Sequence, residues 1–414
     1  MKPGLRSRAP LIALLSSSGV SMAGNVMAGI AVPWFVLQTT GSAARAGLAA
    51  AMSYGPTVVA SLFGGVLVDR FGFKRTSVVA DLASGATMAA IPLMHATVGL
   101  EFWQLMALVF TGSLLDAPGV IAREALVPQM AQSAGMPLER ATASIQVIER
   151  TSRLVGAPLA GLVIAVAGAT TALWIDAATF AVSGLAVALG VPDARVARGP
   201  RGRYWSEMTD GLRFLFRDRV VKWIAITVMV SNFLDTPLFS VALPVYAKRV
   251  LGSPVALGAM LGASGGGAVL GALIFGWLGP RLPRRAVFAG GFFAHGVLLW
   301  VLITLPPLPV AVAALALSGI AVGPLNPVIG AVQFERIPEH MRGRVFGAAL
   351  ALSWVSIPVG TILAGWLIEV AGLRVVFVAV AGAYAVWTLG IVVNPVFREL
   401  DASRRIPPEQ PTPL

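Results

Sequence analysis

Cysteine is absent from this chain of 414 residues, and charged residues make up only 12% of it. The lack of cysteine excludes disulfides, thiolate metal sites and thiol catalysis. An ordinary soluble domain has about 25% charged residues, so the shortage of charge argues against a soluble protein. Histidine is also rare. His95, His295 and His340 show no metal-ligand spacing, and we expect no bound metal.

Nucleotide-binding and nucleic-acid-binding features are missing as well. None of Lys2, Lys74, Lys222 and Lys248 lies in a G-x-x-x-x-G-K-[ST] loop, so we expect no ATP drive and no cofactor. The formal net charge of +12 would suit a nucleic-acid-binding protein. The basic residues, however, lie between apolar runs and do not form a binding face. We therefore expect no nucleic-acid partner.

Apolar runs dominate what is present, with 57% hydrophobic residues and a mean hydropathy of +0.81. A run of about 20 apolar residues is long enough to cross a bilayer as a helix, and in lipid only helices and closed barrels satisfy the backbone. The sequence predicts an all-α polytopic membrane protein with twelve transmembrane helices. The segments are 10–38, 46–68, 76–97, 102–122, 141–166, 169–191, 222–247, 254–279, 284–305, 308–331, 342–370 and 373–396.

The basic residues predict the orientation of these segments. The first run is too long for a cleaved signal peptide, so we interpret it as a retained span. With the N-terminus in the cytoplasm, only Arg45, Lys248, Arg249 and Arg374 of the 31 Lys and Arg residues lie outside, and Arg150 and Arg153 lie at the start of the fifth span. This asymmetry follows the positive-inside rule. We expect both termini in the cytoplasm.

The longest hydrophilic stretch divides the chain into two sets of six spans. We predict a first six-helix bundle over 1–191, a cytoplasmic linker over 192–221, a second six-helix bundle over 222–397 and a cytoplasmic tail over 398–414. Within the linker, TDGLRFLFRD is either a solvated segment or an amphipathic helix. In the second case, the lipid-facing residues would be Leu212, Phe214, Leu215 and Phe216.

The two halves repeat one another. A shift of 211 residues gives twelve identities in the 40 positions from 31 to 70, among them Gly41 with Gly252 and Gly47 with Gly258. A later shift of 204 residues aligns Gly161 with Gly365, and Gly168 with Gly372. Parallel repeats of this kind are typical of transporters that rock two bundles about a site near mid-membrane, and here the two bundles would be related by a pseudo-twofold axis.

The loop GGVLVDRFGFKR, residues 64–75, joins the second and third spans. It resembles the G-x-L-x-D-R-x-G-R/K-R loop of the major facilitator superfamily. The resemblance implies a conformational latch between the two bundles. The latch residues would be Gly65, Asp69, Arg70, Gly72, Lys74 and Arg75. The repeat copy at 276–285 has Pro280 in place of Asp69, so the acidic part of the latch occurs once.

Other stretches resemble the multidrug and macrolide efflux branch of that superfamily. They are DAPGVIAREALVP (116–128), WIDAATF (174–180) and IPEHMRGRVFG (337–347). LPPLPV (305–310) and FREL (397–400) are similar to Tap-type tetracycline and aminoglycoside efflux proteins of actinobacteria. The chain departs from the branch at Asn25, where an acid is frequent, and at Pro158, which lies one place late.

Asp235 is a carboxylate near the middle of an apolar segment. A charge at the centre of a bilayer costs at least about 2.5–3.5 kcal/mol on insertion scales, so it needs a partner, a proton or a hydrated cavity. The resemblance implies that the first, fourth, seventh and tenth spans line a central cavity, and these spans carry Asn25, Asp116, Asp235 and Asn326. Asn232 lies one turn before Asp235. We predict Asp235 as the proton-coupling residue, with a hydrogen-bonded structural acid as the alternative.

Other side chains complete the predicted site. Gln146, Glu149 and Arg153 share one face of the fifth span, where Glu149 and Arg153 are spaced to pair. They are predicted to contact substrate or gate the site, or else to lie at the interface. Asp116 and Glu149 are the further proton-coupling candidates. Asp176 fits a structural acid better. Candidates for stacking on an amphipathic substrate are Trp34, Phe35, Tyr54, Phe233, Phe239 and Trp354.

Together these features predict a proton-coupled exporter of amphipathic small molecules, a drug:H⁺ antiporter in the bacterial inner membrane. We expect a monomer whose partners are substrate, protons and lipid. Export of one endogenous metabolite such as a siderophore, and proton-coupled uptake, remain open alternatives. A membrane enzyme is the other class, which substrate turnover in proteoliposomes would reveal.

Overall fold

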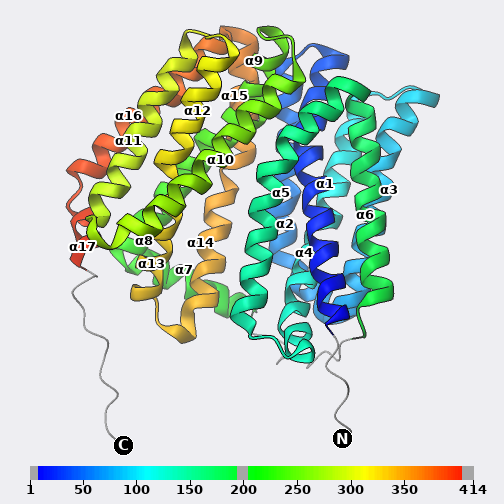
Figure 1. Ribbon diagram of the computed structural model, residues 1–414, viewed down its shortest axis with the longest axis horizontal. Helices are drawn as coiled ribbons and strands as arrows, with labels where there is room; N and C mark the ends of the chain where they lie inside the picture. The colour runs from blue at the N-terminus through cyan, green and yellow to red at the C-terminus, as the bar shows by residue number, and fades with distance from the viewer. Residues whose placement is uncertain (1–7, 194–203, 403–414) are drawn as a thin grey trace, which may run out of the picture. The chain divides into compact units, whose positions relative to one another are not determined.

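The computed structural model describes residues 8–193 and 204–402, apart from the side chains of 61–67, 69, 70, 204–208, 280 and 402 (Figure 1). In these ranges the chain is helical, with short connections. Eleven helical segments are long and apolar enough to cross a membrane by their length and composition. The predicted span 46–68 lies in helix α2 (Ala43–Phe71), which is not among these eleven. Most of the undescribed side chains belong to this helix. The predicted all-helical polytopic fold is confirmed at this level.

The first half contains six long helices. They are α1 (Ala9–Thr40), α2 (Ala43–Phe71), α3 (Phe73–Thr97), α4 (Phe102–Ala134), α5 (Leu138–Ala167) and α6 (Ala169–Gly190). Glycines with positive φ end several of them. Gly41 (φ 67°) follows α1, and Gly72 (φ 88°) separates α2 from α3. A side chain at such a φ would be strained, which explains glycine at these tight turns.

The second half has more interruptions. It contains α7 (Tyr204–Arg217), α8 (Arg219–Pro237), the π-helical turn η1 (Leu238–Ala242), α9 (Leu243–Arg249), α10 (Pro254–Leu278), the 3₁₀ turn η2 (Gly279–Arg281), α11 (Arg284–Ile303), α12 (Leu308–Val322), α13 (Leu325–Arg336), the 3₁₀ turn η3 (Glu339–Met341), α14 (Arg342–Val355), α15 (Ile357–Ala371), α16 (Leu373–Val393), the 3₁₀ turn η4 (Pro395–Arg398) and α17 (Glu399–Ala402). Pro237 precedes η1, and Pro324 lies between α12 and α13. Proline lacks the N–H that an uninterrupted helix needs.

Backbone geometry supports the internal repeat. Gly252 has a φ of 63°, close to that of its repeat partner Gly41. Gly168 and Gly372, which the second shift aligns, have φ values of 86° and 90°. The matched identities therefore include glycines that make equivalent turns in both halves.

The described residues form two compact units. Unit 1 contains the described parts of Met1–Arg201, Phe233–Gly262 and Val355–Val376. Unit 2 contains those of Gly202–Asn232, Ala263–Trp354 and Phe377–Leu414. Parts of α8, α10 and α15 thus pack with the helices of the first half.

Two close helix contacts in unit 1 are related by the repeat. A Cβ on Gly47 of α2 would lie 2.9 Å from the Cα of Gly365 on α15. A Cβ on Gly161 of α5 would lie 3.0 Å from the Cα of Gly258 on α10. The repeat matches Gly47 with Gly258, and Gly161 with Gly365. Small residues let membrane helices approach this closely.

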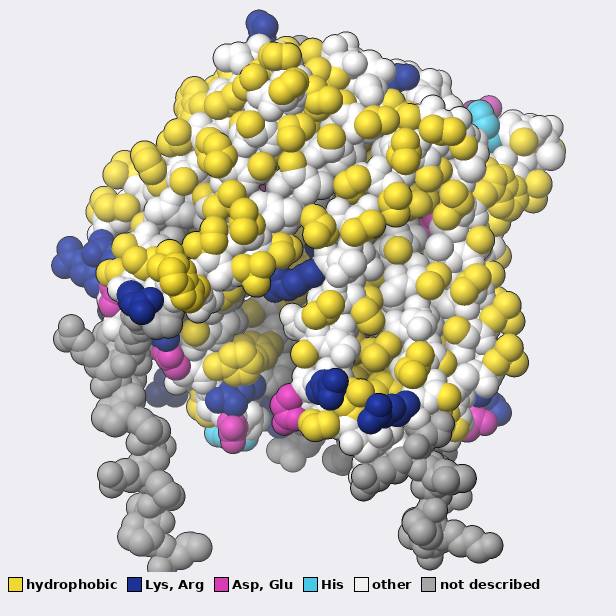
Figure 2. Space-filling view, viewed as in Figure 1, with side chains coloured by type: hydrophobic (Ala, Val, Ile, Leu, Met, Phe, Trp, Pro, Cys, Tyr) yellow, Lys and Arg dark blue, Asp and Glu magenta, His cyan; other side chains and the backbone are white. Residues whose placement is uncertain are grey.

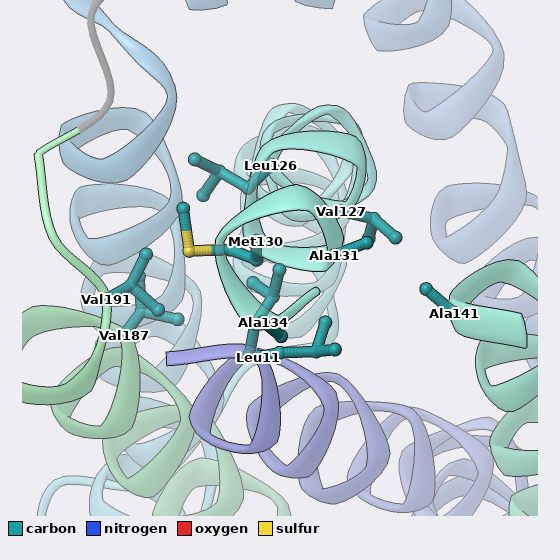
Figure 3. Packing of buried hydrophobic residues seen from close by; sticks show 10 residues of the cluster. Leu11, Leu126, Val127, Met130, Ala131, Ala134, Ala141, Val187 and Val191 are labelled. Atoms are coloured by element: carbon teal, nitrogen blue, oxygen red, sulfur yellow. The ribbon is translucent and has the colours of Figure 1, made fainter. Parts of the chain in front are cut away.

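An apolar core joins α1, α4 and α6 in unit 1. Leu11, Leu126, Met130 and Val187 are at most 1% exposed and belong to one cluster (Figure 3). Many other large apolar side chains are exposed, such as Val166 at 81% and Leu189 at 86%. Hydrophobic side chains cover much of the face seen in Figure 2, as a lipid-facing surface requires.

The amphipathic segment predicted in the linker is helix α7, but its apolar residues do not all face lipid. Leu215 is fully buried in a unit 2 cluster with Val221 and Val345, and Leu212 and Phe214 pack against that cluster. Phe216 is exposed. The prediction that all four face lipid is therefore wrong, because protein side chains cover three of them.

Candidate functional site

A buried polar cluster lies among the helices of unit 1. We use this name for a set of seven residues: Ser21 and Asn25 of α1, Asp81 of α3, Asp116 and Arg123 of α4, and Asp176 and Ser183 of α6. Four helices, each with a long apolar stretch, bring these side chains together. Polar and ionisable groups inside membrane segments are costly, and they are therefore a functional-site hypothesis by default.

An ion pair between Asp81 and Arg123 is the central contact of the cluster. Their side chains are 0% and 4% exposed. Ser183 donates a hydrogen bond of 2.7 Å to Oδ2 of Asp81, and Arg123 donates one of 3.2 Å to Oγ of Ser21. A buried charge must be paired and hydrogen-bonded to be tolerated. This pair meets both conditions.

Asp116 lies at the edge of this ion pair. Nδ2 of Asn25 donates a hydrogen bond of 3.0 Å to its Oδ2. A guanidinium nitrogen of Arg123 lies 3.9 Å from its Oδ1, which is too long for a hydrogen bond but close for an ion pair. The Asp116 side chain is 18% exposed, unlike that of Asp81. Asp116 therefore shares Arg123 with Asp81 and keeps partial access to the surroundings.

Asp176 is the third carboxyl of the cluster. Its side chain is fully buried, and neither carboxyl oxygen has a hydrogen-bond partner among the described residues. The hydrogen bonds that a structural acid would make are therefore not found among the described residues. Gly24 of α1 makes room for it and for Thr179, since a Cβ there would lie 2.6 Å from Oδ1 of Asp176 and even closer to Oγ1 of Thr179.

The charges of the cluster do not balance. It has three carboxyl groups and one guanidinium, so the fully ionised cluster would carry two net negative charges. An unpaired charge is expensive in an apolar interior, and a carboxyl there takes up a proton instead. The arrangement can therefore bind and release protons.

Sequence reasoning found only part of this cluster. It identified Asn25 and Asp116 as separate cavity residues, and the structure places them in direct contact. It missed Asp81 and Arg123. Asp81 lies within the apolar run 76–97, so a count of every ionisable residue inside such runs would have found it.

The candidates in the second half are arranged differently. Asp235 is half-buried on α8, one turn before the π-helical turn η1. Nδ2 of Asn232 donates a hydrogen bond of 2.9 Å to the backbone oxygen of Ser353. Asn326 is exposed on α13. π-helical turns occur frequently at functional sites, and sequence periodicity did not reveal this one.

The aromatic candidates fall into two groups. Trp34 and Phe35 are 2% and 3% exposed and make packing contacts in unit 1. Nζ of Lys248 lies 5.5 Å from the Trp34 ring centroid, and Phe35 packs edge-on against His95. The second group is partly buried and consists of Tyr54, Phe233, Phe239 and Trp354. Their stacking on substrate remains a prediction.

The predicted charged face of α5 is present. Arg153 donates a hydrogen bond of 2.9 Å to Glu149, and the two side chains are 69% and 44% exposed. Gln146 is also exposed. The spacing of four residues therefore predicted the pair correctly. Its accessibility distinguishes it from the pair of Asp81 and Arg123.

The predicted latch is described only in part. Gly72 makes the turn between α2 and α3, Lys74 is partly buried and Arg75 is exposed. Gly65 lies within α2, and the side chains of Asp69 and Arg70 lie outside the described residues. The latch remains a prediction.

A charged contact in unit 1 joins the start of α2 to segments of the second half. Arg249 donates a hydrogen bond of 2.7 Å to the backbone oxygen of Gly41. Glu369 of α15 accepts one of 2.9 Å from the backbone N–H of Ala43 and lies 3.6 Å from Arg249. We call this contact the end clasp. Its bond between Glu369 and Ala43 joins the same two helices, α15 and α2, as the contact of Gly47 with Gly365.

Comparisons with known proteins agree with this architecture. Residues 14–268 and 227–413 match the model of the Major Facilitator Superfamily. The chain is 34% identical over 412 residues to the multidrug efflux pump Tap of Mycobacterium tuberculosis, covering 98% of each chain. It is 23% identical to macrolide efflux protein A of Streptococcus pyogenes, over 84% of this chain and 86% of that protein.

Solved structures show the same fold. The crystal structure of nucleoside transporter NupG superposes with a TM-score of 0.76 at 15% identity, covering 96% of this chain and 100% of the other. Together with the family match, this confirms the prediction of a membrane transporter and not an enzyme. The chain belongs to the major facilitator superfamily.

Proposed function

We propose that the chain exports amphipathic small molecules, antibiotics among them, in exchange for protons. The similarity to the multidrug efflux pump Tap along 98% of both chains supports this class of substrate. One observation carries the proton coupling: the buried polar cluster holds three carboxyl groups and a single guanidinium.

The proposed topology is that of the sequence analysis. Twelve spans form bundles over 1–191 and 222–397, a cytoplasmic linker covers 192–221, and both termini are cytoplasmic in a bacterial cell membrane. The matched turns at Gly41 and Gly252, and at Gly168 and Gly372, support equivalent paths in the two halves. We propose that the protein works as a monomer.

Alternating access would use the two contacts that the repeat relates. In the proposed orientation, the end clasp lies on the outer side of the membrane. The contact of Gly47 with Gly365 and that of Gly161 with Gly258 would separate when the site opens outward. The clasp would open in the same step, because Glu369 bonds the first N–H group of α2.

Coupling would depend on whether Arg123 pairs with Asp81 alone or with both Asp81 and Asp116. An ionised Asp116 competes with Asp81 for Arg123, whereas a protonated Asp116 leaves Arg123 to Asp81. A cationic substrate favours an ionised carboxylate, so its binding would release a proton. In the second half, Asp235 is the candidate for proton coupling. Glu149 on α5 of the first half is a third candidate.

Efflux against an imposed pH gradient in proteoliposomes tests the proposal. We expect wild-type protein to move a cationic drug uphill, and Asp116→Asn to lose this activity because its charge no longer changes. Asp193→Asn is the matched control, since Asp193 is an exposed carboxylate just after α6. Full uphill efflux by Asp116→Asn would remove Asp116 as a coupling residue. Wild-type efflux without any response to the gradient would overturn the antiport itself.

A further inference from the structure

Asp176 is the one carboxyl of the buried polar cluster whose proton contacts are not yet accounted for: Asp81 pairs with Arg123, and Asp116 with Asn25. It lies on α6, whose other buried polar group, Ser183, already bonds Asp81. The nearby hydroxyl of Thr179 donates its proton to the backbone oxygen of Asp176 itself, at 2.7 Å. The Thr179 hydroxyl therefore does not bond the carboxyl group of Asp176. Both carboxyl oxygens of Asp176 lack a hydrogen-bond partner among the described residues.

The charged groups on the helices around Asp176 do not neutralise it. Helix α1 has no ionisable side chain. Helix α3 contributes Asp81, which is committed to Arg123 and Ser183. On α5, Glu149 and Arg153 pair with each other at an exposed position. From α4, Arg123 is committed to Asp81, and Asp116 is a further carboxyl that carries the same sign of charge when ionised.

Asp116 and Asp176 are linked through consecutive residues of α1. Asn25 donates its hydrogen bond to Asp116, while Gly24 leaves the space that Asp176 occupies. The two carboxyls therefore lie next to the same turn of α1. One of them is partly exposed and has partners, and the other is fully buried and has none among the described residues.

A purely structural role does not explain this placement. A structural acid satisfies its oxygens with donors, because an unsatisfied buried polar group is costly. Asn or Ser at position 176 would avoid the cost of a buried charge. A carboxyl gives one property that those residues lack, the ability to gain and lose a proton.

We propose that Asp176 is a second proton-binding carboxyl of this transporter, which holds a proton while Asp116 is ionised. One proton is shared by two groups: it resides on Asp176 when Asp116 is bound to Asn25 and Arg123, and it passes to Asp116 or to water when the surroundings of Asp176 become hydrated. The O–H bond broken at Asp176 is matched by the O–H bond formed at the acceptor. The idea rests on the proposed proton coupling.

Infrared spectroscopy of the purified full-length protein tests this assignment without any transport. We expect wild-type protein at neutral pH and without substrate to show the C=O stretching band of a protonated carboxyl. Asp176→Asn should lose this band, because the amide cannot hold the proton. Asp193→Asn, the exposed control, should keep it.

A second measurement covers the case in which Asp176→Asn does not fold. In Asp116→Asn the band should remain, but it should disappear at a lower pH than in wild type, since a neighbouring negative charge has been removed. The assignment is overturned if the wild type lacks the band at neutral pH, if Asp176→Asn retains it, or if Asp116→Asn leaves its pH range unchanged.

The outcome is separable from that of the proposed function. Wild-type efflux without any response to a pH gradient would defeat the antiport, yet the band would still report the proton on Asp176. The converse result, gradient-driven efflux without the band, would leave the antiport standing and overturn only Asp176.

Discussion

The polar groups of the two halves differ in how their charges are held. In the first half, the buried polar cluster holds three carboxyl groups on three helices, and Arg123 lies close to two of them, Asp81 and Asp116. In the second half, Asp235 is half-buried beside a π-helical turn, Asn232 is bonded to a backbone oxygen, and Asn326 is exposed. The repeat therefore preserves the backbone turns but not the ionisable chemistry.

We propose that this difference reflects different roles of the two halves in proton binding and substrate binding. A fixed cluster with more acids than bases is suited to hold protons, because its net charge must be adjusted by protonation. Half-buried and exposed polar groups are suited to meet a substrate of variable shape, and Asp235 among them is also the proposed coupling residue of the second half. The following substitutions test this comparison, starting with the largest expected effect.

Arg123→Ala should have the largest effect on stability. It leaves Asp81 buried without its cation, and loss of one partner from a buried pair costs about 3–5 kcal/mol. The matched control is Arg153→Ala in the exposed pair with Glu149, which should cost about 0.2–1 kcal/mol. Unfolding in detergent measures both variants. Equal losses would show that the burial of the cluster is not what gives Arg123 its importance.

Asp235 and Asp116 should respond differently to a longer acid. Asp235→Asn should abolish uphill efflux but preserve downhill exchange, and Asp235→Glu should keep part of the coupled activity. Asp116→Glu should not, since the extra methylene disturbs the hydrogen bond of 3.0 Å with Asn25. Drug efflux against a pH gradient measures all three variants. Equal rescue by Glu at both positions would contradict the contrast between a fixed and an adaptable carboxylate.

Gly47→Ala should weaken the contact between α2 and α15. The new Cβ would lie 2.9 Å from the Cα of Gly365, and overpacking of this kind typically costs about 1–3 kcal/mol. Labelling of a cysteine placed at the buried Ala43 should then become faster, in a chain that has no other cysteine. Gly29→Ala is the control, because nothing lies within 4 Å of its added Cβ. Unchanged labelling would mean that this contact does not hold the helix ends together.

Glu369→Gln in the end clasp should have the smallest effect. Arg249 and Glu369 are 43% and 41% exposed, so solvent screens the pair, which is worth about 0.2–1 kcal/mol. The amide oxygen of Gln can still accept from Ala43. We expect a modest increase in the labelling rate at position 43 that vanishes at high salt. A large effect independent of salt would point to the hydrogen bond to Ala43 as the main part of the clasp.

The fold was largely predictable because its causes are local and periodic. Long apolar runs identified the helices, and repeated glycines identified turns whose positive φ the structure shows at Gly41 and Gly252. The breaks in the second half were less visible. Pro237 and Pro324 suggest interruptions, but the π-helical turn η1 depends on how neighbouring helices pack.

For the candidate site, the sequence predicted some of the residues but none of the contacts between them. The sequence alone determined that Asp81, Asp116, Arg123 and Asp176 each lie in or beside an apolar run, and therefore that each is costly in a membrane. Only the tertiary structure decided which of them neutralise one another. Arg123 meets an acid 42 positions away, while Asp176 meets no donor among the described residues. Pairing depends on distances between helices that packing fixes, and no local spacing along the chain encodes it.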